Sequence, residues 1–188
     1  MNMKKIISFF IVACCAMCAT AAKVVWQIGV ADNSGTELAL GPSEYKKFLA
    51  HDFGYEDRYF LVGTSVDKND FPYVLPGPDD TWGGTWSTSG WRTHDANILF
   101  GIKKLPKHGK WKLVVDLVDA NPSRSVVKVM VNSAEKKFEI KGHSKGVLEG
   151  NLQDAKEQIL EFPISANDLK KGGNMVTVSV LEGGWIVF

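Results

Sequence analysis

The chain has 188 residues, of which 45% are hydrophobic and 23% are charged, and its formal net charge is +1. This length predicts a single domain, and this composition excludes a chain that is disordered throughout. The charge also argues against a strongly basic nucleic-acid-binding protein, because such proteins carry a clear excess of Lys and Arg.

The first 21 residues have the features of a secretory signal peptide. Lys4 and Lys5 form a positive start, Ile6 to Met17 is an uncharged run, and Ala19-Thr20-Ala21 is an A-x-A cleavage site. The apolar run is too short to cross a bilayer. We therefore expect a secreted or periplasmic protein, with a signal peptide at residues 1–21 and a single domain at residues 22–188.

A lipoprotein is the alternative form of export. Ile11 to Cys14 could serve as a lipobox, and Cys14 would then carry a lipid anchor at the cell surface. All three cysteines (Cys14, Cys15 and Cys18) lie in this segment. Cleavage after Ala21 leaves a mature chain without cysteine, which excludes disulfides, thiolate nucleophiles and Cys-ligated metals.

The rest of the chain shows mostly β patterns. In residues 110–119, Trp111, Leu113, Val115 and Leu117 alternate with other residues, which indicates a half-buried strand. Similar patterns predict strands at 24–29, 58–63, 98–102, 126–131, 136–140, 159–164 and 174–181. Many short strands with Gly, Pro and Asn between them predict an all-β fold, an antiparallel jelly-roll β-sandwich.

Two short helices are expected within this β fold. Residues 43–52 show helical spacing of apolar residues and are followed by Gly54. Ser165 to Asp168 has the S-x-x-D form of a capping box, which predicts one short turn. At the C-terminus, the apolar run 185–188 has no polar tail. This favours truncation in the last strand; the alternative is a true C-terminal strand that completes a sheet.

The candidate site lies in the irregular segment 67–97. Three tryptophans, Trp82, Trp86 and Trp91, occur there in a Gly/Ser/Thr-rich loop, and long loops of this kind are usually functional or disordered. An indole ring packs on the C–H face of a sugar, and polar side chains satisfy its hydroxyls. The predicted carbohydrate-binding residues are Trp82, Trp86, Trp91, Arg92, His94, Asp95 and Asn97.

The alternative, purely structural interpretation is that these tryptophans cover one end of the core. The other three, Trp26, Trp111 and Trp185, lie in strand patterns and are expected in the core. We predict no catalytic residue, no metal site and no cofactor. Asp79-Asp80 and Asp32-Asn33 are minor candidates for calcium, and solvated turns are the simpler interpretation of both.

Signatures of known enzyme classes are scarce. The sequence has no G-x-S-x-G, H-E-x-x-H, P-loop or G-x-G-x-x-G motif. The four histidines show no metal-ligand spacing. The cluster of Arg92, His94 and Asp95 beside Trp91 is a candidate for acid/base chemistry, so cleavage of a glycan by the chain itself stays a minor alternative.

The order of short motifs along the chain resembles a known family. The motifs are Trp26 to Gly29 with Asp32 after it, Tyr59 to Ser65, Asp70 to Pro72, Ile98 to Ile102, Trp111 to Leu113, Val127 to Asn132, Phe162 to Ser165, Leu169, Gly172 to Asn174 and Val176 to Val178. This pattern is similar to the carbohydrate-binding-like third domain of the rhamnogalacturonan lyase family, polysaccharide lyase family 4. The resemblance covers Val24 to Phe188.

The resemblance implies a jelly-roll β-sandwich that accompanies a catalytic domain, with pectin, especially rhamnogalacturonan I, as the polymer. In the lyases this domain follows a catalytic domain and a small middle domain, whereas here it directly follows the signal peptide. The catalytic residues of the lyases therefore have no counterparts in this chain. The Trp-rich segment 81–91 is also longer than the family pattern leads us to expect.

The leading expectation is an exported, non-catalytic carbohydrate-binding module that forms the N-terminal piece of a polysaccharide-degrading enzyme. Its expected partners are a polysaccharide or oligosaccharide, in particular a pectic one, and a downstream catalytic domain, with no nucleic acid and no membrane beyond the signal peptide or lipid anchor. One alternative is a domain that only packs on a neighbouring catalytic module, because exposed apolar patches often mark interfaces. The other is a polysaccharide lyase or glycosidase.

Overall fold

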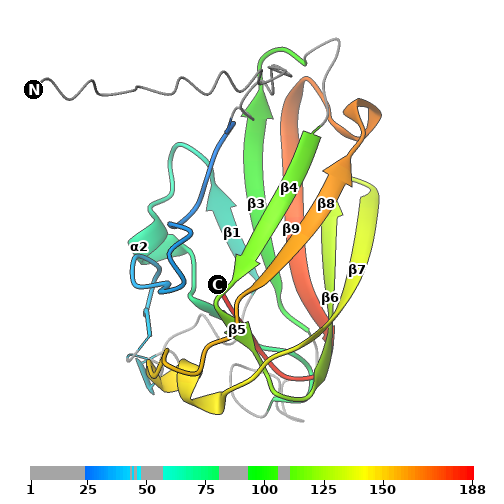
Figure 1. Cartoon of the computed structure of the whole chain (residues 1–188). Helices are drawn as coiled ribbons and strands as arrows, with labels where there is room; N and C mark the ends of the chain where they lie inside the picture. The colour runs from blue at the N-terminus through cyan, green and yellow to red at the C-terminus, as the bar shows by residue number, and fades with distance from the viewer. Residues whose placement is uncertain (1–23, 43, 45, 48–56, 81–92, 106–110) are drawn as a thin grey trace, which may run out of the picture.

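The computed structural model describes residues 24–42, 44, 46–47, 57–80, 93–105 and 111–188 (Figure 1). Short strands dominate this part of the chain. The strands are β1 (Arg58–Leu61), β2 (Val74–Leu75), β3 (Asp95–Ile102), β4 (Trp111–Leu117), β5 (Asp119–Ala120), β6 (Arg124–Val131), β7 (Ala134–Lys141), β8 (Gln158–Ile164), β9 (Gly172–Glu182) and β10 (Ile186–Val187). The short helices are α2 (Asp67–Asp70), η3 (Lys145–Glu149) and η4 (Ala166–Asp168).

A five-stranded sheet forms one layer, in the order β1-β3-β9-β6-β7. Its pairs are antiparallel except for β1 and β3, which run parallel. Antiparallel order was expected from the sequence, so this parallel pair is a departure. Strands β1 and β7 are the two edge strands of this sheet.

Two smaller sheets form the second layer. One pairs β4 with β8, and the other has the order β2-β10-β5. Only the buried Val118 separates the end of β4 from the start of β5, so the two sheets are continuous along the chain. In Figure 1, β4 and β8 lie across the face of β3 and β9. The prediction of an all-β sandwich is confirmed.

The core fills the space between the layers and follows the alternation along each strand. Ala96, Ile98 and Phe100 of β3 face inward, and so do the valines at every second position of β6. The second layer contributes residues such as Leu117 and Leu160. The predicted core tryptophans are confirmed: Trp185 is buried, and Trp26 and Trp111 are partly buried against the core.

Two close contacts fix the lower end of the second layer, where β5 meets the segment after β7. The buried Asp119 side chain accepts hydrogen bonds from three backbone N–H groups, those of Ala120, His143 and Ser144, at 2.8–3.1 Å. Gly142 lies so close to Ala120 that a Cβ would come within 1.6 Å of the Ala120 carbonyl oxygen. Only glycine fits at this position.

Several predicted elements differ from the structure. Residues 24–29 do not form a strand, although Trp26 packs against Phe100 with ring centroids 5.3 Å apart. The capping box at Ser165 is confirmed and begins η4. Of the helix expected at 43–52, Lys46 and Lys47 are helical, and most of the rest lies outside the described residues.

The two ends of the chain bear on the predicted processing. Strand β10 pairs with β2 on one side and β5 on the other, and Phe188 packs against Phe71. Truncation in the last strand stays a prediction. The predicted signal peptide lies outside the described residues. Among the helices that are described, none is long and apolar enough to cross a membrane.

Candidate functional site

The predicted carbohydrate-binding residues fall into two groups. Trp82, Trp86, Trp91 and Arg92 lie outside the described residues, so their part of the site stays a prediction. His94, Asp95 and Asn97 lie at the start of β3. Two nearby residues contact the end of β9: Thr93 donates to the Val180 carbonyl, and the Asp79 N–H donates to the carbonyl of Gly183, which follows β9.

His94 lies inside the protein, with 1% of its surface exposed. Its Nδ1 is 4.0 Å from Oδ1 of Asp57, and the same oxygen accepts a hydrogen bond from the Asp95 N–H at 3.1 Å. Asp57 therefore ties the start of β3 to the residue that precedes β1. The imidazole is therefore buried inside the protein and lies near Asp57.

Asp95 and Asn97 point to the other side of the sheet, away from the core. We call this side the outer face; it carries the outward residues of the five-stranded sheet. The register places Asp95 opposite Ser179 and Asn97 opposite Thr177. Ser179 donates to Asp95, and the Thr177 hydroxyl donates to Oδ1 of Asn97 at 2.7 Å. The outer face thus begins with a ladder of paired polar side chains.

Tyr59 stands next to this ladder. The register of β1 and β3 places it opposite Asn97, about 4.8 Å away at the backbone, and 65% of its surface is exposed. Nδ2 of Asn97 makes no hydrogen bond within the described part of the chain. Asn97 and its partner Thr177 are each only 6% exposed, so the exposed Tyr59 ring borders a largely buried polar pair.

Tyr59 was not among the residues predicted from the sequence, which lie in the Trp-rich segment and just after it. The signal was present in the short segment that became β1. Tyr59 and Leu61 flank the buried Phe60, and this alternation puts both on the solvent side of a strand. An aromatic residue on the solvent side of a border strand has no core role, which is what singles it out.

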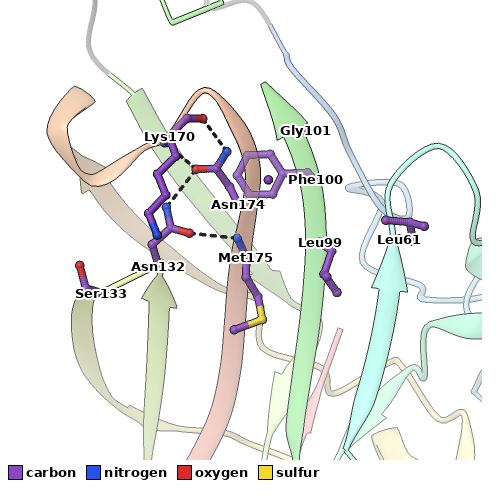
Figure 2. Close-up of a pocket in the computed structure, with 10 residues that line it drawn as sticks. Leu61, Leu99, Phe100, Gly101, Asn132, Ser133, Lys170, Asn174 and Met175 are labelled. Atoms are coloured by element: carbon purple, nitrogen blue, oxygen red, sulfur yellow. Dashed lines mark hydrogen bonds between the residues drawn. The ribbon is translucent and has the colours of Figure 1, made fainter. Parts of the chain in front are cut away.

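A shallow depression of about 710 Å³ lies further along the outer face. Leu61, Leu99 and Met175 border it on one side, and Asn132, Asn174 and Lys170 on the other (Figure 2). Its floor is made by Gly101 of β3 and Gly173 of β9, which lie opposite each other in the sheet.

The acidic residues do not build a metal site in the described part of the chain. No group of three or more His, Cys, Asp or Glu side chains comes together there. Asp80 is the unusual carboxyl group: burial, together with the negative charge of Asp79, raises its pKa to about 7. Its Oδ2 is buried and has no hydrogen-bond partner.

Comparison with protein families decides what kind of domain this is. The family model described as CBM-like, polysaccharide lyase family 4, domain III, matches residues 24–187. The chain belongs to this family. The match spans both layers of the sandwich, from the segment before β1 to the end of β10. The family suspected from the sequence motifs is thereby confirmed.

Comparison with solved structures found a large glycoside hydrolase among the matches. It is a family GH115 4-O-methyl-α-glucuronidase, BtGH115A, whose title gives it specificity for decorated arabinogalactans. The identity is 17% and the TM-score 0.33, over 50% of this CBM-like chain and 12% of the enzyme. The chain therefore corresponds to a small part of that enzyme's length. Comparison with curated proteins found no match.

Proposed function

We propose that this CBM-like domain is an exported, non-catalytic carbohydrate-binding domain, and that it holds a polysaccharide-degrading enzyme on a pectin or rhamnogalacturonan polymer. Membership of the CBM-like family supports a polysaccharide partner. The observation that carries the proposal is the ring of Tyr59, which is 65% exposed on the outer face.

The exposed Tyr59 ring is a surface on which a sugar ring can stack. The ring offers a flat apolar surface for the C–H groups of a pyranose. Beside the ring, Asn97 and Thr177 are each 6% exposed and form a mutual hydrogen bond. The predicted loop tryptophans remain part of the proposal as a second contact with the same polymer.

Packing on a catalytic module without sugar binding is the second candidate. It rests on exposed apolar side chains at the β1 side of the domain, such as Leu61 and Val66. This candidate predicts that substitutions of these β1-side residues weaken assembly with a neighbouring domain. It also predicts that the chain does not bind free polymers.

The first test is binding of the purified chain to a panel of polymers, by affinity gel electrophoresis and calorimetry. The panel contains rhamnogalacturonan I, homogalacturonan, pectic galactan, arabinogalactan and cellulose. We expect retardation by at least one pectic polymer, and Tyr59→Ala weakens that binding by about tenfold because a stacked ring contributes about 1–2 kcal/mol.

A matched control separates a lost site from a lost fold. Ile159→Ala removes a similarly exposed side chain from β8, on the other layer, and we expect binding and melting temperature to stay unchanged. A Trp86→Ala/Trp91→Ala variant tests the loop separately. Migration without retardation in every polymer contradicts the proposed function; binding that survives Tyr59→Ala but not the double variant moves the site to the loop.

A further inference from the structure

The depression on the outer face has a floor made of two glycines that the backbone does not require. Gly101 and Gly173 lie directly opposite each other on β3 and β9. Neither has a positive φ, and a Cβ added to either would meet nothing within 4 Å. Glycine inside a strand weakens it, and close approach of another molecule to the backbone is a usual reason for its presence.

The walls of the depression differ in character. On one side, the register lines up Leu61, Leu99 and Met175 across three neighbouring strands. Leu61 is 47% and Met175 38% exposed, so this row forms an apolar rim.

The opposite wall is polar and fixed by hydrogen bonds (Figure 2). Asn132 Nδ2 donates to Asn174 Oδ1 at 2.9 Å, and the Lys170 N–H donates to the same oxygen at 2.8 Å. Asn174 Nδ2 in turn donates to the carbonyl oxygens of Lys170 and Gly172. The lysine-bearing segment before β9 is therefore held in place at the edge of the depression.

Positive charge collects around the glycine floor. Lys170 lines the depression, and Lys103 and Lys171 line a second hollow that shares Gly101 with it. All three are exposed, and none forms an ion pair within the described part of the chain. The nearby Asp168 uses its carboxylate to cap η4 at Ser165. In a chain with a formal net charge of +1, this local excess of positive charge is not a general property of the surface.

We propose that the depression over Gly101 and Gly173 binds an anionic glycan, with its carboxylate or sulfate groups facing Lys103, Lys170 and Lys171. The C–H face of one sugar ring lies on the glycine backbone, against the rim of Leu99 and Met175. The inference rests on the proposed carbohydrate binding and adds a charge requirement and a second location to it. The lysines supply attraction to the negative charge, and the glycine floor allows the ring to come close.

The test compares polygalacturonate with a neutral polymer of the same backbone and with a sulfated polymer. Polygalacturonate supplies carboxylates, its carboxyl-reduced form supplies the same chain without charge, and dextran sulfate supplies sulfate esters. We expect the full chain to bind polygalacturonate at least tenfold more tightly than the reduced polymer, and this advantage to shrink as salt is raised. Dextran sulfate is compared with unsulfated dextran, so that the gain in affinity from sulfate is measured on one backbone.

Two variants locate the site. Lys103→Gln/Lys171→Gln lowers affinity for polygalacturonate five- to tenfold and leaves the reduced polymer unaffected. Lys141→Gln/Lys156→Gln is the charge-matched control: both lysines are exposed and neither lines the depression. Gly101→Leu fills the floor, and we expect at least tenfold weaker binding with an unchanged or higher melting temperature, because its Cβ enters open space.

The outcomes separate the two proposals. Equal binding of polygalacturonate and its reduced form overturns the charge requirement and leaves the proposed function intact. An equal loss in the test and control lysine pairs means non-specific adsorption of polyanions and overturns the site. If Gly101→Leu does not fold, Gly101→Ala and the lysine pair decide the question. Failure of every polymer to bind, neutral ones included, contradicts the proposed function itself.

Discussion

Two aspartates in the lower half of the sandwich have opposite surroundings. Asp119 is fully buried, and three backbone N–H groups donate to its carboxylate. Oδ2 of Asp80 is also buried but accepts no hydrogen bond, and burial raises the pKa of this carboxyl group to about 7. Asp119 therefore stabilises the fold as a hydrogen-bond acceptor. A negative charge on Asp80, in contrast, destabilises the folded protein.

The raised pKa of Asp80 predicts a pH dependence of stability. The folded protein holds this proton up to about pH 7, whereas the unfolded chain releases it near pH 4, so this group makes stability fall as pH rises between those values. Asp80→Asn cannot ionise. We expect the variant to match the natural chain near pH 4 and to be about 1–2 kcal/mol more stable above pH 7, after discounting the shift for partial exposure.

Denaturant unfolding across this pH range measures the difference. Asp154→Asn, a change at an exposed aspartate, serves as the control and leaves the pH profile unchanged. Parallel profiles for Asp80→Asn and the natural chain would show that Asp80 ionises normally in the folded state.

At the scale of elements, the sequence predicted strands wherever one face is buried over several residues. The segment 110–119 contains β4 at Trp111–Leu117, and 126–131 lies within β6, because alternation over six or more residues is a clear signal. Strands β2 and β5 have two residues each, too few to show a period. The parallel direction of β1 depends on its distant partner β3, which local patterns do not encode.

The candidate site was predictable only in part, for similar reasons. Asp95 and Asn97 were singled out from the sequence, and the structure places both on the outer face. His94 was singled out with them, but it lies one residue before β3 and its ring is buried. Tyr59 and the Gly101–Gly173 pair reach this face through strand pairing between distant segments, so the sequence did not show them together.

Strand β10 has only two residues but occupies the middle of its sheet. Ile186 is fully buried and pairs with Leu75 on one side and Ala120 on the other. We expect Ile186→Ala to lower the free energy of unfolding by about 2–4 kcal/mol, because it leaves a cavity between the layers. Denaturant unfolding checks this value.

The control for this prediction is Val30→Ala, at a valine that is 60% exposed, with an expected change below about 0.5 kcal/mol. A loss of less than about 1 kcal/mol for Ile186→Ala would show that β10 contributes little to the core and that its pairing is marginal.

At the scale of the whole molecule, the proposed contacts lie along one strand. Tyr59 and Asn97 lie near the start of β3, and the glycine floor lies near its end. Asn97 and Gly101 are four residues apart on β3, which is about 13 Å at about 3.3 Å per residue. A polymer that follows β3 could therefore contact both positions at once, and a bivalent contact binds more tightly than either part.

Export is the prediction that concerns the chain as a whole. Expressed from residue 1 in a bacterial host, the chain is expected to lose residues 1–21, so that mass spectrometry of the mature protein finds Ala22 at its N-terminus. A lipidated Cys14 supports the lipoprotein form of export instead. Recovery of the uncleaved chain in the cytoplasm would contradict both forms.

The edge strands β1 and β7 of the five-stranded sheet limit its pairing with other copies of the protein. At β1, the Ser65 hydroxyl accepts a hydrogen bond from the Leu61 N–H, which occupies a donor that another strand could use. At β7, five of the eight residues are charged, three of them Lys. Short or charged borders discourage edge-to-edge pairing between copies. Many copies bound side by side on one polysaccharide fibre would therefore resist aggregation through pairing of their edge strands.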